Sequence, residues 1–303
     1  MADLRVNIAG IEFKNPVITA SGTFGFGREY NQIYPINRLG GISCKGTTLF
    51  ERDGNLPPRI AETPSGILNS VGLQNPGVDA FLQNEVPWLK EQGTVIIANI
   101  AGSKIEDYLM TAEKLNGSAV DMIELNISCP NVKEGGVSFG TSAKSVENIT
   151  KEVKKISDKP IMIKLTPNVT DIAEMAAAAE AGGADAVSLI NTLTGMKIDI
   201  NSRRPLLKNN TGGMSGAAVF PVALRMVWQV ASRVKIPVVG MGGITKWEDA
   251  VEMLLAGASA IQVGTANYTD AYAPLKIISG IEEYLDSNNE KSVNDIVGKV
   301  QIW

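Results

Sequence analysis

The chain has 303 residues, of which 44% are hydrophobic and 20% charged, and its formal net charge is -4 at pH 7. These values are typical of a globular protein with a full core, and the negative charge argues against nucleic acid as the main partner. No apolar run approaches the roughly 18 residues of a membrane span, and the N-terminus lacks the basic and apolar blocks of a secretory signal. We therefore expect a cytoplasmic protein without a membrane anchor.

Histidine is absent, and the chain has only two cysteines. Two cysteines do not support a disulfide framework, which agrees with a reducing compartment. The lack of histidine removes the usual general base and the commonest metal ligand. Acid-base chemistry must then fall to Cys, Lys, Asp, Glu or Tyr, and no metal site is predicted.

The predicted elements begin with a small hairpin over residues 4–13, in which apolar side chains alternate around Ala9-Gly10. We expect it to plug one end of the main fold. Eight short apolar segments then read as strands, over residues 17–20, 42–45, 95–100, 120–125, 161–165, 186–190, 238–240 and 260–263. Helical patterns occur at 78–90, 105–115, 142–156, 171–181, 219–234 and 247–255, with Ser142 and Asp171 as N-caps.

This alternation, in a chain somewhat above the typical barrel length of about 250 residues, predicts an α/β fold, a (β/α)8 TIM barrel forming one domain over residues 1–303. A doubly wound open sheet is the alternative. Two connections, residues 47–76 and 192–216, exceed the usual loop lengths. We expect them to be functional loops at the C-terminal face of the barrel.

Cys129 stands on the loop that leaves the fourth predicted strand, within the stretch 124–131. Gly135, Gly136 and Gly140 follow it, which is typical of a catalytic residue on a moving loop. The alternative is a small buried hydrophobe, since free cysteine is often buried. A thiol has a pKa of about 8.5 and is intrinsically reactive, so Cys129 is a candidate catalytic residue. Cys44, by contrast, is expected in the core.

Five strands end in a polar side chain. Alternation along a strand groups Lys45 with Ser43, and Asn191 with Val187 and Leu189. Because buried amines and amides need polar partners, we expect these five side chains to converge on one polar site. In a barrel that site is the active site. The five residues are Lys45, Asn99, Asn126, Lys164 and Asn191.

Glycine-rich turns follow the seventh and eighth strands, at residues 240–245 and 263–265. Their backbone amides can approach an anion, and a helix beginning near Lys246 would add its positive N-terminal end. Loops at these two positions are the common phosphate site of such barrels. The residues therefore predict a barrel enzyme for a phosphate-bearing ligand.

Four motifs together resemble dihydroorotate dehydrogenase, a flavin enzyme of pyrimidine synthesis, and the similarity runs nearly end to end. They are Asn126-Ile-Ser-Cys-Pro-Asn131, Lys45-Gly46-Thr47-Thr48, residues 69–77 and Gly240-Met-Gly-Gly-Ile244. The resemblance implies FMN, with its phosphate on Gly242, Gly243, Gly264 and Thr265. It places Ser21, Lys45, Gly46, Asn99, Asn126, Lys164, Ile190 and Gly216 around the rest of the cofactor.

The same resemblance implies that Cys129 is the catalytic base for oxidation of dihydroorotate to orotate. It assigns substrate binding to Lys45, Asn69, Ser70, Val71, Gly72, Leu73, Asn126, Asn191 and Thr192. A flexible lysine such as Lys45 suits a substrate carboxylate, and Lys164 suits negative charge developing on the reduced flavin.

The motifs also bear on the electron acceptor. Quinone-linked members carry a serine where Cys129 stands, and residues 45–48 and 73–76 look more like the NAD-linked class 1B than the fumarate-linked class 1A. Class 1B implies a partner subunit that carries FAD and a two-iron two-sulfur cluster. The two cysteines of this chain could not ligate such a cluster. The class also implies a homodimer within a heterotetramer. Two competing hypotheses are a phosphate-sugar aldolase or isomerase with Lys164 as a Schiff-base nucleophile, and a structural subunit without the chemistry.

Overall fold

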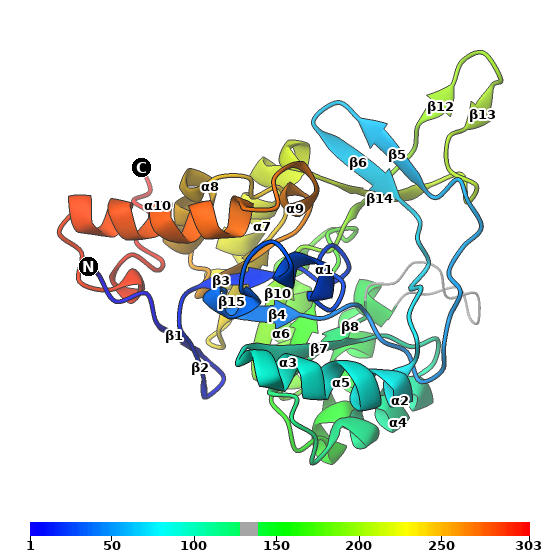
Figure 1. Ribbon diagram of the computed structural model, residues 1–303, viewed down its shortest axis with the longest axis horizontal. Coiled ribbons are helices and arrows are strands. Elements are labelled where there is room, and N and C mark those ends of the chain that lie inside the picture. Colours follow the sequence, from blue (N-terminus) through cyan, green and yellow to red (C-terminus); the bar gives the residue numbers. More distant parts are fainter. Residues whose placement is uncertain (128–138) are drawn as a thin grey trace.

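A closed barrel of eight parallel strands forms the centre of the protein, with helices around it (Figure 1). This computed structural model describes residues 1–127 and 139–303. The barrel strands pair in chain order and the last pairs with the first, so the open-sheet alternative is wrong. They are β3 (Val17–Thr19), β4 (Gly41–Ser43), β7 (Val95–Ile100), β8 (Met122–Asn126), β9 (Ile161–Lys164), β10 (Ala186–Leu189), β15 (Val238–Met241) and β16 (Ala260–Val263).

All eight predicted strands are confirmed, with ends shifted by at most two residues. Their side chains are almost all buried, because the strands are covered by helices outside and packed against each other inside. That two-sided burial explains why they read as short continuous apolar runs. Cys44, directly after β4, is fully buried as expected.

The helices also follow the prediction where their apolar spacing was clear. Asp171 caps its helix through hydrogen bonds from the backbone N–H groups of Ala173 and Glu174, whereas Ser142 holds the N-cap position without a capping bond to the described helix. The helices are α1 (Arg28–Asn31), α2 (Val78–Ala80), α3 (Val86–Gln92), α4 (Ile105–Leu115), α5 (Ala143–Ile156), α6 (Ile172–Ala181), α7 (Phe220–Ala231), α8 (Trp247–Leu255), α9 (Ala266–Thr269) and α10 (Ala273–Ser287). A π-helical segment, Phe81–Glu85, joins α2 to α3, and 3-10 turns occupy Ile36–Arg38, Phe139–Thr141, Ala217–Val219 and Val293–Asp295.

The N-terminal hairpin, β1 (Val6–Ile8) and β2 (Ile11–Phe13), lies against the amino ends of the barrel strands. The Phe13 ring is fully buried and comes within 3.0 Å of the position that a Cβ on Gly41 would occupy. Because Gly41 begins β4, the hairpin covers the end of the barrel opposite the strand carboxyl ends, as predicted.

The two long connections were predicted only as loops, but they fold together into a four-stranded antiparallel sheet. Its strands, in spatial order, are β11 (Leu193–Gly195), β14 (Gly212–Ser215), β6 (Gly66–Asn69) and β5 (Ile60–Thr63). A small hairpin, β12 (Ile198–Asp199) and β13 (Arg204–Pro205), projects beyond it (Figure 1). Segments more than a hundred residues apart in the sequence therefore build one structure. Within the two described ranges, no helix is long and apolar enough to cross a membrane.

Candidate active site

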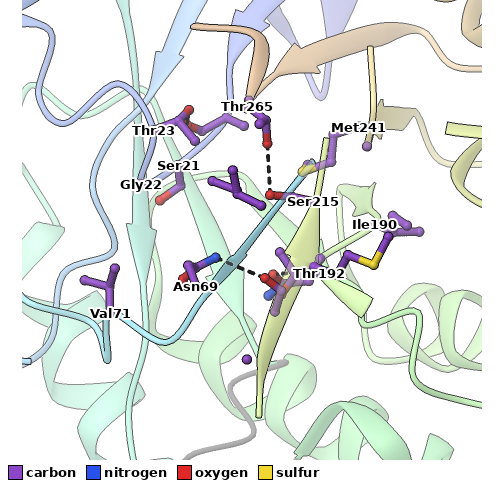
Figure 2. A pocket seen from close by; sticks show the side chains of 18 of the residues that line it. Ser21, Gly22, Thr23, Asn69, Val71, Ile190, Thr192, Ser215, Met241 and Thr265 are labelled. Atoms are coloured by element: carbon purple, nitrogen blue, oxygen red, sulfur yellow. Dashed lines mark hydrogen bonds between the residues drawn. The ribbon is translucent and has the colours of Figure 1, made fainter. Parts of the chain in front are cut away.

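A cavity of about 370 Å³ lies between the carboxyl ends of the barrel strands and the four-stranded sheet. Strand ends supply its floor and walls, while Ile67 and Asn69 of β6 and residues 212–215 of β14 close it from the other side (Figure 2). Its volume is in the range of small-ligand sites. This is the face on which barrel enzymes carry their active sites.

The five polar strand ends do converge: Lys45, Asn99, Asn126, Lys164 and Asn191 all line this cavity. The Asn191 side chain donates a hydrogen bond to Asn126 Oδ1 at 3.3 Å, which joins the ends of two strands. The predicted grouping of Asn191 with Val187 and Leu189 on one face of a strand is nevertheless wrong. β10 ends at Leu189, and its Ser188 bonds inward to Glu124, so alternation does not extend from Leu189 to Asn191.

Most of the other predicted site residues also line the cavity. They are Ser21, Gly46, Asn69, Ser70, Val71, Gly72, Leu73, Ile190, Thr192, Gly242, Gly243, Gly264 and Thr265. Gly216 stands just outside the wall, beside the lining residue Ser215, and a Cβ there would lie 2.6 Å from Gly66 Cα. Its visible function is therefore close packing of β14 on β6. Cys129, Gly135 and Gly136 lie outside the described residues.

The turn after β15 can pack closely against the start of α7 because Gly242 and Gly243 have no side chains. Both have positive φ, 123° and 77°. A Cβ on Gly243 would stand 2.6 Å from the backbone nitrogen of Phe220, so only glycine is accommodated there. α8 begins at Trp247, close to the predicted start. On the facing turn, Thr265 Oγ1 donates to Ser215 Oγ at 2.9 Å (Figure 2).

The loop from Asn69 to Leu73 is held in place through its backbone. Asn55 binds it twice, its N–H donating to Val71 O at 2.9 Å and its side chain to Ser70 O at 2.8 Å. The buried Asn75 side chain donates to Leu73 O at 2.6 Å and accepts from the Gly77 N–H at 2.9 Å. These asparagines leave the inner edge of the loop facing the cavity as a preformed wall.

Two lysines give the cavity a positive electrostatic character. Burial lowers the pKa of Lys45, and the nearby charges of Arg59 and Lys164 lower it further. Lys164 is 5% exposed and lies on the floor. An anionic group in the cavity would relieve the cost of holding these cations together out of water.

A fully buried carboxylate, Glu124, lies inside the barrel below the cavity, which it does not line. Burial alone would raise its pKa, but the charge of Lys164 and hydrogen bonds from neighbouring side chains outweigh burial, and the pKa lies below its usual range. Glu124 is therefore ionised at neutral pH. Alternation along the strand groups Glu124 with Asn126, but sequence reasoning did not say which face points inward and gave Glu124 no function.

Gln262 was also missed, although it lines the cavity and is fully buried. The sequence did carry a signal for Gln262, because it is a polar residue within the otherwise apolar strand β16. Met241, Ser215 and Tyr268 line the cavity as well and carried no comparable signal. In residues 1–127 and 139–303, no three or more His, Cys, Asp or Glu side chains come together as metal ligands would.

A barrel whose carboxyl-end mouth combines two lysines, several asparagine amides and a glycine turn has the architecture of barrel enzymes that bind small ligands at this face. The family model for dihydroorotate dehydrogenase matches residues 3–285. The chain belongs to the dihydroorotate dehydrogenase family, as its motifs indicated.

Individual relatives agree with this assignment. A protein of Bacteroides fragilis is 57% identical over 303 residues, covering all of both chains, and one of Bacteroides thetaiotaomicron is equally similar. A protein of Alkaliphilus oremlandii is 55% identical over 298 residues, covering 98% of this chain and 99% of its own. Each of the three bears the name dihydroorotate dehydrogenase B (NAD(+)), catalytic subunit.

Proposed function

We propose that this protein is a cytoplasmic oxidoreductase that converts dihydroorotate to orotate in pyrimidine biosynthesis, as a flavoprotein with FMN in the cavity described above. The observation that carries the proposal is the convergence of Lys45, Lys164 and three asparagines on a cavity with a glycine-walled turn. The name borne by relatives 57% identical over their full length supports the same reaction.

The residues present fit FMN on structural grounds. Gly242, Gly243 and Gly264 all line the cavity, and glycine turns let backbone N–H groups come close to a phosphate. Asn99 Oδ1 is buried with no hydrogen-bond partner among the described residues, as expected of an atom awaiting a donor. Bound FMN would supply a hydride acceptor, which no side chain provides.

The chain's own residues would bind and deprotonate the substrate. Oxidation removes a proton from one carbon and a hydride from its neighbour, and Cys129 would take the proton as a thiolate base. Lys45 would hold the substrate carboxylate, with Asn126, Asn191 and the loop from Asn69 to Leu73 fixing its orientation. Lys164 would balance negative charge that develops on the cofactor.

We further propose that electrons leave through a partner subunit to NAD. The name of the relatives, a catalytic subunit, supports the existence of such a partner. The resemblance to class 1B implies that the partner carries FAD and a two-iron two-sulfur cluster. Such a cluster usually takes four cysteines and this chain has two, so the cluster would lie on the partner. Cys44 is fully buried in the core, which leaves Cys129 alone. A homodimer within a heterotetramer is the corresponding assembly.

The purified protein should be yellow, with a flavin absorption spectrum and about one FMN per chain. The flavin is extracted with acid and quantified, and its amount divided by the protein concentration gives the number of FMN molecules per chain. An aldolase or isomerase barrel would be colourless, and borohydride would trap its substrate on Lys164. A folded protein that contains no flavin and takes up none on incubation with FMN would contradict the proposed function.

Replacing Lys45 with alanine should weaken orotate binding by roughly 2 kcal/mol or more, about 30-fold, because the ligand carboxylate loses its countercharge in a mostly buried place. Titration of the flavin spectrum with orotate measures the affinity. Lys114→Ala removes an exposed lysine paired with Asp79 and is the matched control, expected to bind normally. Unchanged affinity in Lys45→Ala would assign Lys45 to a structural or cofactor role.

A further inference from the structure

Glu124 accepts four hydrogen bonds from four other strands of the barrel. Its Oε2 accepts from Ser43 Oγ at 2.7 Å and from the Asn99 amide at 2.6 Å. Its Oε1 accepts from Ser188 Oγ at 2.8 Å and from the Gln262 amide at 2.9 Å. Two of these donors, Asn99 and Gln262, line the cavity, whereas Ser43 and Ser188 do not.

An ionised carboxylate can only accept hydrogen bonds, so both amides must turn their NH₂ groups toward Glu124. Their oxygen atoms then face away from it. Asn99 Oδ1 and Gln262 Oε1 are both buried with no partner among the described side chains and backbone groups. The Asn99 oxygen lies 3.0 Å from the position of a Cβ on Gly46, itself a lining residue. At these two lining residues, the side-chain atoms left without a hydrogen bond are therefore acceptors, not donors.

The same carboxylate supplies negative charge to a cavity that otherwise holds only cations. Lys164 interacts electrostatically with Glu124 and lines the floor. Without Glu124, Lys45 and Lys164 would face the cavity with no buried countercharge among these neighbours. One buried group thus sets both the hydrogen-bonding polarity and the net charge of the cavity floor.

We infer that Glu124 is a positioning residue for the cofactor: it fixes the amide oxygens of Asn99 and Gln262 toward the bound flavin and moderates the positive charge of Lys164. This inference rests on the proposed function, because it takes FMN as the ligand. The negative charge disfavours electron-rich reduced flavin, so Glu124 holds the reduction potential below the value that Lys164 alone would give.

Glu124→Gln tests the inference in the FMN-loaded protein by a redox titration. The variant removes the charge and lets one amide flip its NH₂ toward the cavity, and both changes favour the reduced flavin. We expect the two-electron reduction equilibrium to shift at least tenfold toward reduced FMN, which is a rise of about 30 mV. Glu124→Asp keeps the charge and should return the potential toward that of the unsubstituted protein.

Ser188→Ala is the matched control. It removes one hydrogen bond from Glu124 but leaves the charge and both amides, so stability should fall while the potential stays unchanged. If Glu124→Gln lowers the melting temperature as Ser188→Ala does and leaves the potential unaltered, Glu124 is merely structural and the inference is wrong.

A second measurement needs no destabilising variant. In the unsubstituted protein, the side-chain NH₂ groups of Asn99 and Gln262 should exchange slowly with deuterium in an NMR experiment, because both are bonded to a buried carboxylate. Rapid exchange of both would overturn the inference even if Glu124→Gln fails to fold. Since the amides are held without flavin, this result stands apart from the proposed function, which fails if the unsubstituted protein cannot bind FMN or cannot oxidise dihydroorotate.

Discussion

Replacing Cys129 with serine should slow reduction of bound FMN by dihydroorotate by roughly 10²- to 10⁴-fold, the usual cost of losing a general base. An alcohol is a far weaker acid than a thiol, and the chain has no histidine that could take over the proton. Rapid mixing of the loaded protein with dihydroorotate, followed by the loss of flavin absorbance, measures this step directly. FMN binding should be retained.

The second cysteine offers a matched control. Cys44 is fully buried in the core, and burial raises the pKa of its thiol, so it cannot serve as a base at neutral pH. Cys44→Ala should lower stability by about 1 kcal/mol or somewhat more through the small void it leaves, with flavin reduction at the normal rate. Normal reduction in Cys129→Ser at neutral pH would show that another group removes the proton.

The barrel was predictable because its strands are buried on both sides and read as short apolar runs in regular alternation with helices. The four-stranded sheet was not. Its strands are short and only partly buried, and one, Gly212–Ser215, contains two glycines. Nothing in the local sequence distinguishes such segments from loops, and the pair that joins the two connections, β6 with β14, lies more than a hundred residues apart in the sequence.

The residues of the candidate site also differ in whether the local sequence could identify them. Lys45, Asn99, Asn126 and Lys164 could be placed because each lies within two residues of the carboxyl end of a strand, and these ends meet at one face of a barrel. Glu124 and Gln262 lie within their strands, and their importance depends on donors and acceptors from other strands. A polar residue inside an apolar strand indicates a buried partner, but the sequence does not say which.

The isolated chain should reduce artificial dyes with dihydroorotate but should not reduce NAD. Among the described residues, the glycine turns at Gly242-Gly243 and Gly264 line the cavity to which our proposal assigns the flavin. The sequence has no Gly-x-Gly-x-x-Gly following a strand, so it shows no dinucleotide fingerprint of its own. A hydride or electron route to NAD must then pass through another protein.

The decisive assay combines the purified chain and dihydroorotate with either NAD or fumarate, first without a second protein and then with an iron-sulfur flavoprotein partner. Dye reduction in the same preparation shows that the first half of the reaction is intact. We expect NAD reduction only after the partner is added, because its FAD and cluster supply the missing connection between FMN and NAD. Rapid turnover with fumarate would place the chain in class 1A, and rapid reduction of NAD by the chain alone would rule out the need for a partner.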